Sequence, residues 1–344
     1  MDRLFSRPVR WTSRWLALVF FVAATASAAG PDTPEVLPKP APGSSQPPVS
    51  ERPNALVEKA RALGSQSRIP SAEGFLEMLH NPRPSQVELP PVSTIPMRGA
   101  ELARRAASAH LRVGWIFRCS KCSNWHTNLA GGYAIAADTV VSAYHVLGAV
   151  PQNMVPGTGF PVIIRGEDDI LPITAVLAAD ARLDTMILRI LSDDLTALPL
   201  ADKIEVGDPV CCLSDPFGRR GLFTMGIVNC LDGYSEGSAD RPPGRRLIVS
   251  TDWAPGSSGS AVLDSFGNAV GHVDTIQALT SQKKPDEERK SGPESPAAVL
   301  TLHFAVSASS VRALLESCAQ MAAPSRLKSN ILPPFFAAPS GKPP

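Results

Sequence analysis

Three separate segments of the chain carry the residue types needed to make a serine hydroxyl nucleophilic. That chemistry requires a neutral imidazole to accept the hydroxyl proton, a carboxylate to orient the imidazole, and N–H groups to bind the negative oxygen formed on the substrate. Ser258 lies in the run APGSSGSAV, residues 254–262. Gly256 and Gly259 permit a tight turn that a β-carbon would hinder. Such a turn would aim the N–H groups of Gly256 and Ser258 at one point, although an ordinary Gly/Ser loop has the same composition.

The base and the acid are predicted beside hydrophobic runs typical of buried strands. His145 follows the run TVVSAY and is the candidate base, the alternative being a histidine satisfied within the core. Asp184 precedes the run MILRI at 186–190 and is the candidate acid, the alternative being an ordinary turn aspartate. Asp180 is a rival for the same role. His145, Asp184 and Ser258 therefore form the predicted catalytic set.

The middle of the chain alternates short β-branched runs with Gly, Asp and Pro turns, which is typical of an all-β sandwich or barrel. Ten runs are predicted to be strands: 133–137, 139–143, 161–164, 186–190, 210–213, 222–228, 247–251, 261–263, 269–273 and 299–306. Helical spacing of apolar residues predicts a short helical segment over 54–110, where Ser71 caps a helix carrying Phe75. The same spacing predicts a C-terminal helix over 309–321.

Together these segments resemble the trypsin-like serine proteases, and in particular their HtrA, or DegP-like, branch. The matching motifs in chain order are SAYH (142–145), DxxxDxxxLxI (180–190), GD (207–208), PFG (216–218), GIV (226–228), TD followed by PGSSG (251–259) and FAV (304–306). The order His, Asp, Ser is that of the family. The resemblance covers roughly residues 111–318 and includes several independent motifs.

The resemblance implies an all-β fold of two six-stranded antiparallel β-barrels, with the triad in the cleft between them. It implies that Ser258 attacks, that His145 transfers the proton, and that Asp184 orients His145. The N–H groups of Gly256 and Ser258 would form the oxyanion hole. The predicted function is a serine endopeptidase that hydrolyses peptide bonds of exported or unfolded proteins through an acyl-enzyme intermediate. The alternatives are a catalytically retired trypsin-like peptide-binding module and a structural protein of the cell envelope.

The chain departs from the family pattern at three places. Ser260 stands where the family usually has glycine after the Ser-Gly pair, a variant that also resembles the glutamyl endopeptidases. The nucleophile loop is shortened between Asp252 and Pro255. No length remains after Ala305 for the PDZ domain that HtrA proteins usually carry, so none is expected.

Two residues are candidates for the substrate pocket. Asp252 lies six residues before Ser258, which is the spacing of the aspartate that selects Lys or Arg in trypsin-like enzymes; HtrA relatives instead have a structural Thr-Asp pair here. His272 lies one position before the place of the pocket histidine of glutamyl endopeptidases. Because neighbouring strand residues face opposite sides, Val273 is predicted to face the pocket and to favour a small apolar side chain.

The N-terminus has the pattern of an export signal, with four arginines before an apolar run at 15–24 and the triplet ASA at 26–28. The alternative is an uncleaved anchor, and only in that case is membrane association expected. The predicted organisation, in chain order, is a signal peptide (1–28), a Pro-rich linker (29–53), a helical segment (54–110), a protease domain (111–318) and a Pro-rich tail (319–344). The expected location is the bacterial periplasm or the outside of the cell.

Six cysteines, an even number, are compatible with disulfides in an exported chain. Cys119 and Cys122, with His126 nearby, could form half of a zinc site, but a full site needs four ligands. A disulfide is the simpler interpretation of the pair, so no metal and no other cofactor is predicted.

Composition and charge narrow the classes of partner. Apolar residues make up 44% of the chain and charged residues 19%, which is ordinary for a globular protein. The formal net charge of +1 gives no field that favours nucleic acid, so none is expected as a partner. The predicted partners are protein or peptide substrates, and the sequence indicates no oligomeric state.

Overall fold

The structure, a computed structural model, describes residues 53–233, 245–280 and 298–322. All of them belong to one compact unit, residues 50–344. The predicted signal peptide and nearly all of the predicted linker lie outside the described residues. Residues 281–297, before the last strand, and the predicted tail beyond residue 322 also lie outside the described residues.

The N-terminal half of the described chain forms one antiparallel sheet with the strand order β5-β4-β1-β2-β3-β7-β6. Its strands are β1 (His110–Arg118), β2 (Trp125–Ala136), β3 (Thr139–Ser142), β4 (Phe160–Arg165), β5 (Asp169–Leu171), β6 (Ile173–Asp180) and β7 (Thr185–Ile190). Pro172, which has no N–H to donate, separates β5 from β6. This half is a curved, open seven-stranded sheet rather than the closed six-stranded barrel that was predicted.

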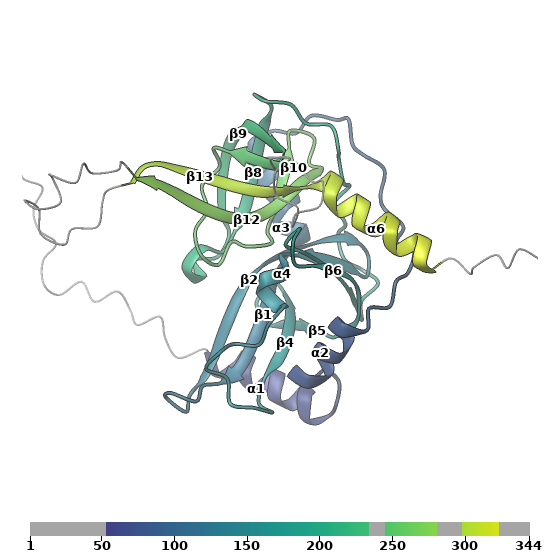
Figure 1. The fold of residues 1–344 in the computed structure, drawn as a ribbon, viewed down its shortest axis with the longest axis vertical. Helices are drawn as coiled ribbons and strands as arrows, with labels where there is room; N and C mark the ends of the chain where they lie inside the picture. The colour runs from purple at the N-terminus through teal and green to yellow at the C-terminus, as the bar shows by residue number, and fades with distance from the viewer. Residues whose placement is uncertain (1–52, 234–244, 281–297, 323–344) are drawn as a thin grey trace, which may run out of the picture. The chain divides into compact units, whose positions relative to one another are not determined.

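The C-terminal half is a closed antiparallel barrel with the order β10-β13-β12-β11-β8-β9 (Figure 1). Its strands are β8 (Pro209–Ser214), β9 (Leu222–Gly233), β10 (Arg245–Val249), β11 (Ala261–Asp264), β12 (Ala269–Thr280) and β13 (Ala298–Ser307). The prediction of an all-β fold of the trypsin-like type is confirmed. The prediction of six antiparallel strands is confirmed for this half.

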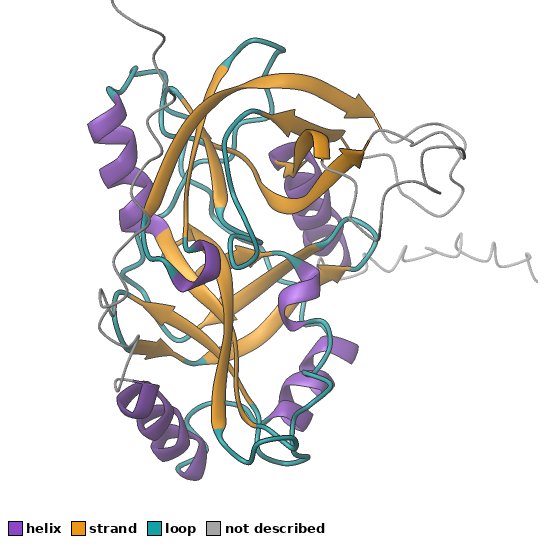
Figure 2. Ribbon diagram, turned by 90° about the vertical axis from the view of Figure 1, so that its left-hand side faces the viewer, coloured by secondary structure: helices purple, strands orange, loops and turns teal. Residues whose placement is uncertain are grey.

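Helices lie around the two sheets, as Figure 2 shows in purple. They are α1 (Pro53–Ser65), α2 (Ala72–His80), α3 (Gly99–Ala109), α4 (Tyr144–Leu147), the 3-10 turn η1 (Pro216–Gly218) and α6 (Ala308–Ala322). The Ser71 hydroxyl accepts the N–H of Gly74 at 3.1 Å, so the predicted cap of α2 is confirmed. Helix α6 continues to residue 322, four residues past the predicted end of the protease domain. Among the described helices, none has the length and apolar character needed to cross a membrane.

The helical annex packs directly on the N-terminal sheet. Phe75 of α2 meets Trp115 of β1 edge to face, with ring centroids 5.9 Å apart. Leu102 of α3 and Val311 of α6 belong to the same buried cluster as Tyr133 of β2. That cluster also contains residues of β8 and β11, so helices α3 and α6 help to join the two sheets. Burial of this shared apolar surface stabilises the contact between the sheets.

Candidate active site

Two residues at the ends of strands of the N-terminal sheet are joined by two hydrogen bonds. His145 lies on the one-turn helix α4 immediately after β3, and Asp184 lies in the turn between β6 and β7. The His145 ring Nδ1 lies 2.8 Å from Asp184 Oδ2, and the His145 backbone N–H donates to Asp184 Oδ1 at 2.9 Å. An ionised carboxylate only accepts hydrogen bonds. The Nδ1 atom therefore carries the proton, which leaves Nε2 of the neutral ring as an acceptor.

The surroundings of His145 favour its protonated form. The hydrogen bond that the His145 ring donates to Asp184 raises the pKa of His145 above its ordinary value; partial burial opposes the rise, and the charges of Asp184 and Asp274 add to it. The His145 side chain is 52% exposed, whereas that of Asp184 is 14% exposed. The carboxylate is thus shielded from water while the imidazole stays open to an approaching molecule.

The backbone of Asp184 is held in an uncommon conformation. Its φ is 47°, in the left-handed region that few residues other than glycine adopt. The buried His272 ring lies behind it, with Nε2 3.2 Å from the Asp184 carbonyl oxygen. Because a carbonyl only accepts, His272 donates from Nε2, and burial lowers the pKa of this ring. A neutral histidine therefore supports the acid from the barrel side.

Asp180 has a different environment. Its Oδ1 atom accepts the backbone N–H groups of Arg182 at 2.8 Å and Leu183 at 3.1 Å. These bonds close the turn that leads into Asp184. Asp180 is the last residue of β6 and its side chain closes the following turn, whereas the carboxylate bonded to His145 is that of Asp184.

The loop that carries Ser258 depends on two glycines with positive φ, Gly256 at 100° and Gly259 at 79°. The Ser258 carbonyl accepts the N–H of Gly131 from strand β2 at 2.8 Å. A β-carbon at Gly259 would lie 2.5 Å from the Gly131 carbonyl oxygen and 2.6 Å from Ser142 Oγ. The absence of a side chain lets the loop dock against the sheet that holds the His145–Asp184 pair.

Two backbone N–H groups of this loop are available to an oxyanion. Within the described residues, the N–H groups of Gly256 and Ser258 donate to no protein group. The Pro255 carbonyl accepts the N–H of Phe217 at 2.8 Å. In a planar trans peptide the C=O and N–H point in opposite directions. The Gly256 N–H therefore points away from Phe217.

His145, Asp184 and Ser258 line one cavity of about 550 Å³. Its remaining lining residues are Ala181, Arg182, Arg246, Trp253, Ala254, Pro255, Val273, Asp274, Thr275 and Ile276. Ser258 is half-buried, and its hydroxyl makes no hydrogen bond recorded within the described part of the chain. The hydrogen bond between a nucleophile and its base is often long without substrate, so this geometry is compatible with the predicted set.

The two pocket candidates lie differently. Val273 is buried and lines the cavity. Asp252 is exposed and is not among the lining residues; its carbonyl accepts the Thr224 hydroxyl at 3.0 Å. The structure therefore brings Val273, but not Asp252, to the cavity that contains Ser258.

Sequence reasoning missed an ion pair in the cavity wall. Arg246 Nη2 lies 2.5 Å from Asp274 Oδ2, and the Arg246 guanidinium stacks 5.4 Å from the Phe304 ring centroid. Strict alternation along β12 would place Asp274 opposite Val273. The register of β12 against β13 shifts between Val273 and Thr275, however, and this bulge lets consecutive residues reach one cavity. The sequence contains no signal for a bulge here.

A His–Asp pair beside the N-terminal sheet and a glycine-flanked serine beside the closed barrel line one cavity. The chain matches the trypsin-like peptidase domain family over residues 130–271. This match confirms the resemblance inferred from the motifs.

Its curated relatives include proteins of the HtrA, or DegP-like, branch. It is 26% identical over 107 residues to a putative serine protease HhoB of Synechocystis, which covers 30% of this chain and 26% of that protein. It is 27% identical over 148 residues to a probable periplasmic serine endoprotease DegP-like of Pseudomonas fulva, and this alignment covers 42% of this chain and 28% of that protein. The aligned part thus spans about a quarter to a third of these relatives' length. A serine endoprotease structure from Yersinia pestis aligns with a TM-score of 0.45 at 17% identity, over 66% of this chain and 68% of that one.

Proposed function

We propose that the chain is a serine endopeptidase that hydrolyses peptide bonds through an acyl-enzyme intermediate. Ser258 would be the nucleophile, His145 the general base and Asp184 the residue that orients it. The observation that carries the proposal is the doubly bonded His145–Asp184 pair, which lines the same cavity as Ser258. A base with a fixed tautomer beside a serine is the arrangement that activates a hydroxyl.

The proposed reaction uses these groups twice. Ser258 Oγ attacks the scissile carbonyl carbon while its proton passes to His145 Nε2. His145 then gives that proton to the departing amine as the peptide bond breaks, which leaves an ester on Ser258. Water attacks the ester with His145 again as base, and the acid product leaves as the Ser258 hydroxyl is restored. Asp184 stays ionised and stabilises the imidazolium.

The N–H groups of Gly256 and Ser258 are proposed to bind the negative oxygen of each tetrahedral intermediate. Removal of one such donor typically slows an enzyme by about 10²–10³-fold. The positive φ of Gly256 supports this role, since it sets the direction of the neighbouring peptide groups. A β-carbon there would lie 2.9 Å from the Asp215 carbonyl oxygen.

Exported or unfolded proteins are the proposed substrates, because the DegP-like relatives are named as periplasmic endoproteases. A small apolar residue before the cleaved bond is the proposed preference. Val273 and Trp253 supply apolar wall, and the charges of Arg246 and Asp274 compensate each other. Binding the substrate through backbone groups would suit unfolded chains of varied sequence.

The test is digestion of a peptide library by the purified full chain, with products identified by mass spectrometry. The expected result is internal cleavage after small apolar residues, which disappears in Ser258→Ala. A chain that binds peptides but leaves them intact, with wild type and Ser258→Ala indistinguishable, would instead be a retired peptide-binding module. Cleavage that persists in Ser258→Ala would assign the nucleophile to another residue.

A further inference from the structure

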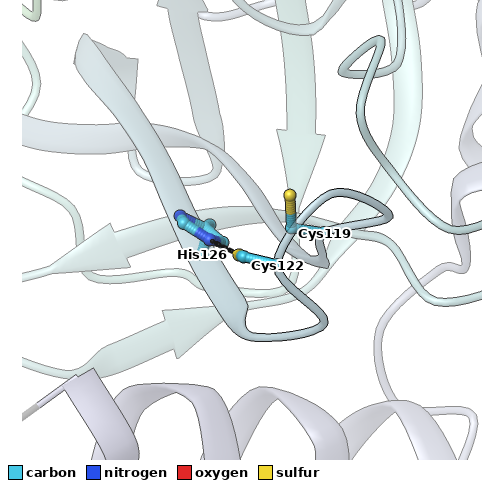
Figure 3. A group of neighbouring side chains, drawn as sticks. All are labelled: Cys119, Cys122 and His126. Carbon is cyan, nitrogen blue, oxygen red and sulfur yellow. Dashed lines mark hydrogen bonds between the residues drawn. The ribbon is translucent and has the colours of Figure 1, made fainter.

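The hairpin between β1 and β2 brings together three side chains that the proposed peptidase reaction does not use. Cys119, Cys122 and His126 each offer one ligand atom, and these atoms all lie within 4.8 Å of one another. Figure 3 shows Cys122 and His126 pointing toward each other, with Cys119 in the same turn. None of the three lines the cavity that contains Ser258.

Backbone hydrogen bonds fix the turn that carries the two cysteines. The Cys119 N–H donates to the Asn124 carbonyl at 2.8 Å, and the Ser123 N–H donates to the Cys119 carbonyl at 2.9 Å. Ser123 has a φ of 61°, which turns the chain back into β2. This conformation brings the second cysteine back beside the strand on which His126 lies.

The histidine is held in place by its neighbour across the strands. Phe117 is the cross-strand partner of His126, and their rings stack with centroids 6.1 Å apart and an interplanar angle of 25°. His126 Nε2 lies 2.9 Å from the Cys122 sulfur. The imidazole therefore presents one nitrogen to the cysteine turn before any ligand arrives.

The Cys119 sulfur lies among hydrogen-bond donors. It accepts the backbone N–H of Lys121 at 3.4 Å and the Asn153 side-chain amide at 3.2 Å. Thiolate is the form of cysteine that binds metal, and hydrogen bonds donated to the sulfur favour that charged form.

The six cysteines are all free thiols in the structure, contrary to the disulfide interpretation favoured by the sequence. The Cys122 sulfur lies 2.9 Å from His126 Nε2 and is not joined to Cys119. Two thiols and an imidazole are the donors that Zn²⁺ selects. The local contacts therefore fit a metal site better than a disulfide.

We propose that Cys119, Cys122 and His126 bind one Zn²⁺ ion, with water as the fourth ligand. Tetrahedral Zn²⁺ with ordinary bond lengths holds its sulfur ligands about 3.8 Å apart, and sulfur and nitrogen about 3.6 Å apart. The three ligand atoms lie within 4.8 Å of one another, and Cys122 is exposed, so a small movement of its side chain would bring them toward these spacings. Binding releases the two thiol protons to solvent, and His126 binds as the neutral ring. The same exposure leaves the fourth position open to water.

The proposal is tested with the full chain, reduced and freed of metal with a chelator, and then titrated with Co²⁺. We expect thiolate-to-Co²⁺ charge-transfer absorption that saturates at one equivalent and is abolished by added Zn²⁺. Cys122→Ser and His126→Ala should each weaken binding at least about tenfold, since loss of even an outer-shell partner costs 10–100-fold. Both residues are exposed, so neither change removes core packing. Cys230→Ser, which removes an exposed thiol of β9, should leave the titration unchanged.

Three results would overturn the metal site. One is a reduced wild-type chain that gives no charge-transfer absorption with Co²⁺. Another is a titration that Cys122→Ser and His126→Ala leave unchanged. The third is a Cys119–Cys122 disulfide that, once reduced, leaves thiols unable to bind Co²⁺ or Zn²⁺. Each readout is independent of peptide hydrolysis, so the peptidase proposal and the metal site can fail separately.

Discussion

The two halves of the molecule hold their parts of the candidate site in different ways. The N-terminal sheet fixes His145 and Asp184 by direct hydrogen bonds between the two residues. The C-terminal barrel fixes Ser258 through the shape of its backbone, because the hydroxyl makes no recorded hydrogen bond in the described part of the chain. Substitutions of side chains in the N-terminal half should therefore lower the rate of the chemical step. Substitutions that alter the backbone in the C-terminal half should displace Ser258.

The two halves meet at Gly131 of β2. Its N–H donates to the Ser258 carbonyl, and its own carbonyl accepts the Ser142 hydroxyl at 2.7 Å. A β-carbon at Gly131 would lie 2.0 Å from Ser260 Oγ. The sheet and the loop that carries Ser258 are therefore in such close contact that a side chain at Gly131 would displace the loop.

The largest effect in the N-terminal half is expected for Asp184→Asn. An amide cannot hold the His145 ring with its proton on Nδ1, so kcat should fall about 10⁴-fold, as for the same change in the best-studied triad. Asp180→Asn is the matched control, since Asp180 caps a turn and does not contact His145. Steady-state kinetics on one peptide substrate measures both. The opposite ranking would reassign the acid to Asp180.

The corresponding backbone change in the C-terminal half is Gly259→Ala. An alanine at φ 79° costs about 1–2 kcal/mol of folding stability, and its β-carbon would also lie 2.5 Å from Gly131 O. Because the clash adds to the conformational cost, we expect the free energy of unfolding, measured with urea, to fall by more than this, and kcat to fall as well. Gly207→Ala is the control, because Gly207 has a φ of 95° but no atom within 4 Å of an added β-carbon. Equal losses for the two variants would show that the loop does not dock as described.

The pH dependence of activity should report the His145–Asp184 pair. Because the pKa of His145 is raised above its ordinary value of about 6.5, the base is protonated over a wider range of pH. We expect kcat/KM to fall about tenfold per pH unit below a midpoint above 6.5. The measurement is kcat/KM against pH on one peptide, with folding checked by circular dichroism. Activity that persists unchanged to about pH 4, where histidine is normally protonated, would exclude a histidine base.

The smallest expected effect concerns His272, the buried neutral ring behind Asp184. Its pKa is lowered by burial, so the unfolded chain binds a proton more readily than the folded one. Stability should therefore fall as pH drops below about 6.5, by at most about 1.4 kcal/mol per pH unit for one proton. His272→Gln keeps a side-chain N–H. It should remove the contribution of His272 to the slope of the free energy of unfolding against pH, measured by urea unfolding between pH 5 and 7. An unchanged slope would show that His272 is not the titrating group.

The sequence predicted the parts of the molecule that depend on local pattern. All ten predicted runs correspond to strands, with ends that differ by at most a few residues, and the capped helix at Ser71 forms as expected. Strands β1, β5 and β6 were not predicted. Strand β5 has only three residues, Gly114 interrupts the apolar run of β1, and alanines at 175, 178 and 179 dilute the β-branched residues of β6. The pairing of β1 and β6 with neighbouring strands buries most of their residues, which no local pattern specifies.

Within the candidate site, sequence reasoning identified the residues on local motifs and missed those that long-range packing brings in. The motif around residue 258 includes the two glycines that the turn requires. Arg246 and Asp274 reach the cavity only through strand pairing and a bulge in β12, which no local pattern specifies. The support of Asp184 by His272 likewise depends on the packing of the barrel against the N-terminal sheet.

The most direct test of the central claim, that the two halves form one catalytic unit, is labelling with a fluorophosphonate. This reagent bonds covalently only to a serine activated by a base. The account predicts one adduct per chain, mapped to Ser258 by mass spectrometry, and its loss in His145→Ala although the serine remains. Absence of an adduct on the folded wild-type chain, or an adduct on Ser258 that His145→Ala leaves unchanged, would contradict the account.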